Sequence, residues 1–226
     1  MTAKSTAVQA VIFDCDGVVM ERNRSAFGPL SDALALQGIT PDRSDLRGLL
    51  RGGNPGSFVK KVIGLGADLP ENWLVAEYDS ILQQLADGAR PVAGIVDVLT
   101  ILDSAGIRYA MASNGPLVKM EVMLAQHDGM ADRFGGHLYS ARSLHTQKPA
   151  PRIFLHAARR LGVPPRRCAV VDDGILGVTA AIAAGMRGFY FAAEDRDGLG
   201  DEGAALSDYA ITPFRAMTEL PALLGL

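Results

Sequence analysis

The stretch VIFDCDGVVMERN (residues 11–23) places two carboxylates directly after a run of apolar side chains. Its first three residues are typical of a buried strand, and Asp14 and Asp16 follow them. Two carboxylates this close repel each other, and removal from water raises the cost of keeping both charged. A plain turn is one interpretation, because Asp and Gly favour turns. A bound cation that offsets the repulsion is the other.

Short apolar runs alternate with segments of helical periodicity through most of the chain. The predicted strands are Ala7–Phe13, Arg108–Ser113, Cys168–Val171, Gly188–Phe191 and Tyr209–Ile211. The predicted helices are Val92–Ala105, Pro116–His127, Pro151–Leu161 and Ile175–Ala184. This alternation predicts an α/β fold in which helices cover both faces of a parallel sheet.

One region interrupts the alternation after the first strand. It contains helical stretches at Ser25–Gln37, Ser57–Leu65 and Glu71–Asp87 and no convincing strand, with Gly38 and Gly88 where helices should end. We therefore expect a core formed by residues 1–22 and 91–226, with a helical domain of residues 23–90 inserted into it.

Composition excludes several classes of partner. The chain has 226 residues, a net charge of -3 and no long basic cluster, so we expect no binding to nucleic acid or to an anionic membrane. Its two cysteines, Cys15 and Cys168, have no metal-type spacing, and no signal peptide or membrane span is evident. These features predict a cytoplasmic protein and leave its oligomeric state, monomer or dimer, open.

Polar residues follow the predicted strands where each one ends, and ligands of parallel sheets bind at that edge. In chain order they are Asp14 and Asp16, Ser113 and Asn114, Lys148 before the next helix, and Asp172 and Asp173. Taken singly, each has a plain interpretation as a turn, a helix cap or a surface lysine. Together, oxygen ligands suited to Mg²⁺, a nucleophilic carboxylate and a lysine indicate phosphoryl chemistry.

These motifs, in this order and spacing, resemble the haloacid dehalogenase-like hydrolase superfamily, specifically its β-phosphoglucomutase and phosphoglycolate phosphatase branch. The resemblance implies a Rossmann-like core with a helical cap and a Mg²⁺-dependent phosphatase that forms an aspartyl-phosphate. By the family pattern, Asp14 is the nucleophile and Asp16 the general acid and base. The implied phosphate ligands are Ser113, Asn114 and Lys148, and the implied metal ligands are Asp14, Asp16, Asp172 and Asp173.

Three departures from the family pattern bear on activity. Glu21 and Arg22 replace the usual Asp-Ser. Asp172, Asp173 and Gly174 replace the usual Glu-Asp-Ser, which shortens one possible metal ligand, deletes a hydroxyl and puts the role of Asp172 in doubt. Residue 26 is alanine where β-phosphoglucomutases carry a histidine, so hydrolysis is favoured over the alternative, a phosphosugar mutase. A non-catalytic phospho-receiver is disfavoured. In receivers the adjacent acid pair ends the first strand, whereas in this chain the adjacent pair, Asp172 and Asp173, comes late.

Substrate selection is expected in the cap. The glycine-rich loop of residues 47–61 carries Arg51 and Lys60, which would contact an anionic group of the substrate or remain a solvated surface. The expected partner is a small phosphorylated metabolite, such as a sugar phosphate, a phosphorylated sugar acid or a phosphoglycolate-like ester.

Overall fold

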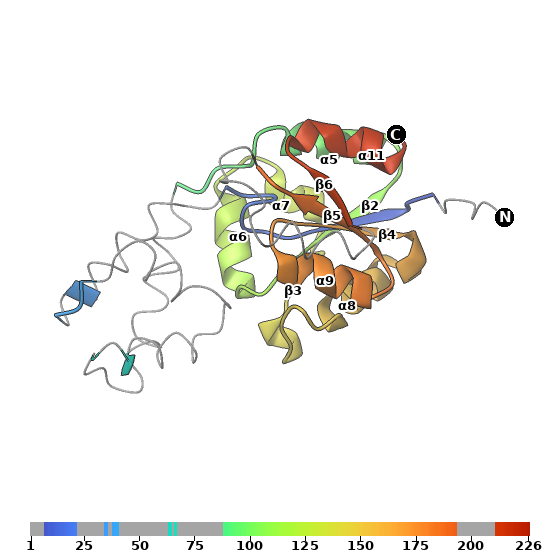
Figure 1. Ribbon diagram of the computed structural model, residues 1–226. Coiled ribbons are helices and arrows are strands. Elements are labelled where there is room, and N and C mark those ends of the chain that lie inside the picture. Colours follow the sequence, from blue (N-terminus) through green and yellow to red (C-terminus); the bar gives the residue numbers. More distant parts are fainter. Residues whose placement is uncertain are drawn as a thin grey trace.

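The computed structural model describes residues 7–21, 34–35, 38–40, 63–64, 66, 88–193 and 211–226. Within them, six strands form one sheet in the order β3-β2-β1-β4-β5-β6, and every neighbouring pair is parallel (Figure 1). The strands are β1 (Ala10–Phe13), β2 (Arg108–Ser113), β3 (Leu138–Ser140), β4 (Cys168–Asp172), β5 (Arg187–Phe191) and β6 (Ile211–Phe214). The predicted α/β class is confirmed.

Helices cover both faces of this sheet. They are α5 (Ile95–Ser104), α6 (Leu117–Ala125), α7 (Met130–Phe134), α8 (Arg152–Leu161), α9 (Ile175–Ala183) and α11 (Leu220–Leu224). Alternate residues of β1 face opposite layers, as a strand requires. Val11 and Phe13 pack in a cluster with residues of α5, α6, α7 and α11, whereas Ala10 and Ile12 pack with α8 and α9. All four are fully buried, which accounts for the unbroken apolar run in the sequence.

The predicted strands and helices of the core agree with the structure in type, with small differences at their ends, whereas the three predicted cap helices fall largely outside the described residues. β6 begins at Ile211 and runs to Phe214, later than the predicted strand at 209–211, whose first two residues lie outside the described part. Strand β3 and helices α7 and α11 were not predicted. They have only three, five and five residues, too few for a periodic pattern to stand out.

Most of the predicted cap lies outside the described residues, including Arg22, Ala26, Arg51 and Lys60, so the domain division stays a prediction. The amide of Glu21 donates to the carbonyl of Arg90 at 2.7 Å, so the chain segments on either side of the insertion lie together. No helix within the described residues is long and apolar enough to span a membrane.

Candidate active site

Three neighbouring strands bring the predicted polar residues to one edge of the sheet. β1 lies between β2 and β4, and its last residue, Phe13, pairs with Met111 and Val171. Asp14 therefore follows β1 between the ends of the two flanking strands, which carry Ser113 and Asp172. The sheet thus assembles residues that are far apart in sequence, as expected for the carboxyl ends of parallel strands.

Lys148 joins two of these strand ends. Its Nζ donates to Oδ1 of Asp14 at 2.6 Å and to Oδ2 of Asp172 at 2.7 Å. The lysine is 5% exposed, and its ammonium lies 5.1 Å from the centre of the Phe154 ring. The backbone amide of Lys148 donates to Oδ1 of Asn114 at 2.9 Å, so the side chain of Asn114 holds the loop that carries the lysine.

The buried charges strongly affect one another. Burial, opposed by the Lys148 charge and aided by the nearby carboxylates of Asp172 and Asp173, raises the pKa of Asp14 to about 7 overall. Burial also raises the pKa of Asp172. For Lys148, burial lowers the pKa, but the two carboxylates outweigh burial and the pKa is raised overall. The lysine is therefore a fixed positive charge beside the Asp14 carboxylate.

Asp14, Asp172 and Asp173 have the geometry of a metal site. One carboxylate oxygen from each lies within 4.8 Å of the others, and all three residues are buried. The ammonium of Lys148 contacts Asp14 and Asp172, so the group of three carboxylates carries more negative charge than this one lysine offsets when all three are ionised. Hard oxygen ligands with excess negative charge suit a divalent cation such as Mg²⁺. The residues present therefore fit the metal that the sequence pattern implies.

Ser113 and Asp172 shape the loops at the edge of the sheet. Ser113 is buried, and its Oγ accepts a hydrogen bond from the amide of Gly115 at 3.0 Å. Asp172 likewise accepts from the amide of Gly174 at 2.9 Å through Oδ1. Both side chains therefore stabilise local turns, and neither is the N-cap residue of the helix that follows. Ser113 and Asp172 are therefore turn residues, as the plain interpretation of the sequence predicted, and they also lie at the candidate active site.

Lys119 is a site residue that sequence reasoning missed. It comes from α6, and its Nζ contacts Oδ1 of Asp16 at 2.6 Å, with the lysine side chain 15% exposed and the aspartate side chain 30% exposed. Burial lowers the pKa of Lys119, but the Asp16 carboxylate raises it overall. The only sequence signal for this residue was its position six residues after Ser113, on the predicted helix that begins at the site.

Fold and site together define a class: an α/β enzyme whose catalytic candidates are a strand-end aspartate, a buried lysine and a group of metal-binding carboxylates. The family model for haloacid dehalogenase-like hydrolases matches residues 8–185, and the chain belongs to this family.

Two relatives illustrate how the similarity is distributed. The 6-phosphogluconate phosphatase of Escherichia coli K12 is 25% identical over 217 residues, covering 96% of this chain and 94% of the relative. The chloroplastic Protein SUPPRESSOR OF QUENCHING 1 of Arabidopsis thaliana is 30% identical over 190 residues, covering 80% of this chain. That alignment covers only 17% of the plant protein, so the chain corresponds to one part of it.

A solved structure of the same family superposes on this chain along most of its length. The crystal structure of a hydrolase of this family from Deinococcus radiodurans R1, with bound phosphate and sodium, superposes with a TM-score of 0.73. It is 26% identical, and the match covers 97% of this chain and 96% of that one. The family match and the phosphatase among the relatives confirm the expected enzyme class, a phosphoric monoester hydrolase.

Proposed function

We propose that this protein is a divalent-metal-dependent phosphatase that acts on a small phosphorylated sugar or sugar acid through an aspartyl-phosphate. The observation that carries the proposal is the Lys148 ammonium held 2.6 Å from Asp14 and 2.7 Å from Asp172. A carboxylate can attack a phosphate dianion only where cations offset the repulsion between them. The site supplies one such cation in Lys148 and a ligand set suited to another.

In the first step, an oxygen of Asp14 attacks phosphorus and the bond between phosphorus and the ester oxygen breaks. Asp16, in its protonated form, gives its proton to the departing alkoxide, which leaves as an alcohol. In the second step, Asp16 takes a proton from water as that water attacks phosphorus. The acyl-phosphate bond breaks, which releases inorganic phosphate and restores the Asp14 carboxylate.

The other residues of the site hold the phosphoryl group. Lys148 and the hydroxyl of Ser113 would contact its oxygens, and Asn114 would keep the Lys148 loop in place through the 2.9 Å hydrogen bond. Mg²⁺, held by Asp14, Asp172 and Asp173, would supply additional positive charge at the transferring group.

Lys119 gives Asp16 a defined position in the resting enzyme. The 2.6 Å contact keeps the Asp16 carboxylate beside α6. To donate a proton to the leaving group, Asp16 must bind that proton and give up part of this ion pair. We propose that substrate binding competes for Lys119, because a phosphate ester brings new negative charge to this edge of the sheet.

The proposed substrate class rests on two supports. A relative that aligns over nearly its full length is a 6-phosphogluconate phosphatase, and its name specifies a phosphorylated sugar acid. Arg51 and Lys60 of the cap would bind a second anionic group of such a substrate, although both lie outside the described residues. The alternative, a phosphosugar mutase, would convert a sugar 1-phosphate to its 6-phosphate isomer instead of releasing phosphate.

The test is phosphate release from a panel of phosphomonoesters, measured with Mg²⁺ and then with a chelator. We expect release by the wild type with Mg²⁺, loss of release with chelator, and almost complete loss in Asp14→Asn, since no other group can form the intermediate. Asp16→Ala should cost about 10²- to 10⁴-fold in turnover. Near-normal release by Asp14→Asn would refute the mechanism, and isomerisation without release would favour the mutase.

A further inference from the structure

A second concave region lies at the opposite end of β2 from the catalytic candidates. It is a cavity of about 560 Å³ formed by the turn between α5 and β2, the start of β2, helix α7 and the end of α8. Arg108 at its wall and Ser113 at the active site are the first and last residues of β2. At about 3.3 Å per residue, these two positions are about 17 Å apart. No residue of the proposed mechanism lines this cavity.

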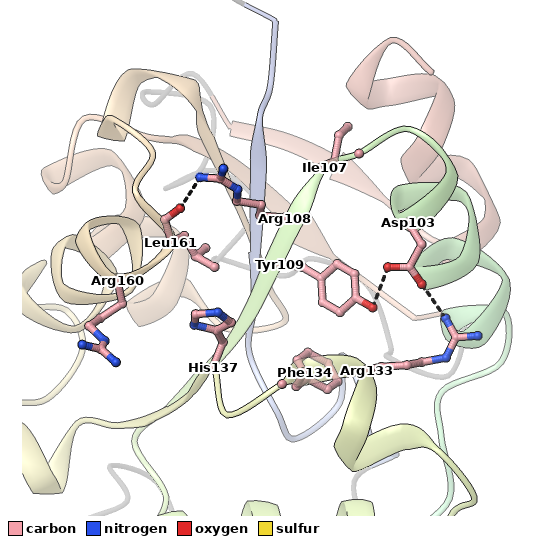
Figure 2. Close-up of a pocket in the computed structure, with 11 residues that line it drawn as sticks. Asp103, Ile107, Arg108, Tyr109, Arg133, Phe134, His137, Arg160 and Leu161 are labelled. Atoms are coloured by element: carbon pink, nitrogen blue, oxygen red, sulfur yellow. Dashed lines mark hydrogen bonds and ion pairs between the residues drawn. The ribbon is translucent and has the colours of Figure 1, made fainter.

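The walls of this cavity carry an excess of positive charge. Arginines from three separate elements line it, namely Arg108 of β2, Arg133 of α7 and Arg160 of α8 (Figure 2). The only carboxylate among its lining residues is that of Asp103. The cavity wall is therefore positive by two charges, although the chain as a whole has a net charge of -3.

Two of the arginines are held in place by contacts that use only part of their hydrogen-bonding capacity. Nη1 of Arg108 donates to the carbonyl of Leu161 at 2.6 Å. Arg133 donates from Nη1 to Asp103 at 3.0 Å and from Nη2 to Thr100 at 3.1 Å. A guanidinium has five N–H donors, so both arginines retain donors for a ligand after these contacts are made. Their anchored positions reduce the entropy lost when a ligand binds.

Aromatic rings form the floor between the arginines. Tyr109 and Phe134 pack edge to face with ring centres 5.4 Å apart, and both are buried. Figure 2 shows Arg108 and Arg133 on opposite sides of the Tyr109 ring, whereas Arg160 lies beyond His137 with its guanidinium turned away from that ring. Separated guanidinium groups around a rigid floor match a ligand whose negative charges are also separated.

We propose that this cavity binds a small polyanion, a compound with two or more phosphate groups, at a site separate from the one that hydrolyses phosphate esters. Its volume lies within the range of about 300–1,000 Å³ that small-molecule sites occupy. Guanidinium groups bind phosphate oxygens in paired hydrogen bonds, and arginines at separate positions of the wall favour a ligand with two or more phosphate groups over a single phosphate. This inference does not depend on the proposed hydrolytic activity.

The test uses inorganic tripolyphosphate as the probe and isothermal titration calorimetry of the full chain in chelator at low salt. The variant Arg133→Gln/Arg160→Gln removes two of the three charges. The control is Arg152→Gln, which removes one exposed arginine from α8 outside the cavity and is matched to Arg160→Gln, the loss of one exposed arginine from the same helix at the cavity. Binding by the wild type should weaken about 10-fold or more in the double variant and less than about 2-fold in the control, because only the first loses direct charged contacts.

Other outcomes would overturn the proposal. No binding by the wild type, or equal affinity in the wild type and the double variant, would refute it. Equal weakening by Arg152→Gln would show nonspecific attraction to a basic surface. Hydrolysis of phosphomonoesters by the double variant should stay at the wild-type rate, which separates this result from any failure of the proposed function. If the double variant does not fold, as judged by circular dichroism, Arg160→Gln alone carries the test, since this side chain is exposed.

Discussion

Replacing Gly177 with alanine should displace the Asp172 carboxylate from the active site. Gly177 lies in the first turn of α9, directly against that carboxylate. A Cβ added to Gly177 would lie 1.8 Å from Oδ2 and 1.9 Å from Cγ of Asp172. No real pair of atoms tolerates such distances, so the carboxylate must rotate or α9 must shift.

The size of the effect follows from what Asp172 would lose. Oδ2 accepts from Lys148 at 2.7 Å, and Oδ1 accepts from the amide of Gly174 at 2.9 Å. Breaking a buried ion pair of this kind costs about 3–5 kcal/mol. The usual gain from replacing glycine by alanine in a helix is at most about 1 kcal/mol and has the opposite sign. For a chain of this length, the net loss lowers the melting temperature by about 5–20 °C.

Thermal unfolding followed by circular dichroism measures this effect, with phosphate release as a second readout. Gly174→Ala is the matched control, because a Cβ there would lie 3.4 Å from Oδ1 of Asp172 and the backbone has an extended conformation open to alanine. We expect a shift of less than about 2 °C for this control, as for ordinary substitutions without a steric clash. Gly177→Ala should also lower turnover strongly, since Lys148 loses one of its two partners.

A double-mutant cycle separates the clash from any general effect on α9. In an Asp172→Ala background the atoms that block a Cβ at position 177 are absent, so Gly177→Ala should cost little there or slightly stabilise the protein. A rise in melting temperature for Gly177→Ala in the wild-type background would refute the reasoning. So would an equal cost in both backgrounds.

Three further predictions concern other charged groups. Lys119→Met should slow the first step, in which the alcohol is released, more for alkyl phosphates than for p-nitrophenyl phosphate, whose leaving group needs no proton from Asp16; equal slowing of this step for both esters in single-turnover measurements would contradict a role of Lys119 in proton donation by Asp16. Burial, aided by the hydrogen bond to Asp103, raises the pKa of Tyr109 from 10.0 to about 12. The neutral phenol therefore stabilises the fold below pH 10, and this stabilisation is lost as the pH rises to about 12. Denaturant titrations should show a steeper alkaline loss for the wild type than for Tyr109→Phe, and parallel curves would refute this assignment. Asp173→Asn should raise the Mg²⁺ concentration needed for half-maximal activity more than about 10-fold, because one of three anionic ligands is lost. An unchanged Mg²⁺ requirement would show that Asp173 is not a metal ligand.

Much of the core could be predicted because its signals are local. The run ending at Phe13 is apolar on both faces, since β1 is covered by helices on both sides, and that burial leaves an unbroken pattern in the sequence. Asp14 and Asp172 stood out for a related reason, as carboxylates placed directly after such runs. Strand β3 left no comparable signal, because three residues are too few to establish a period.

The sequence by itself determined the fold class, the enzyme family and the identities of the strand-end carboxylates. Only the tertiary structure decided which charges meet. Lys148 reaches Asp14 across 134 positions and Lys119 reaches Asp16 across 103, because the order of the parallel strands brings distant segments to one edge. The three arginines of the second cavity are likewise separate in sequence and line one cavity only in the folded chain. Local patterns record burial and periodicity along the chain, whereas these contacts depend on strand order and on how the helices pack across the sheet.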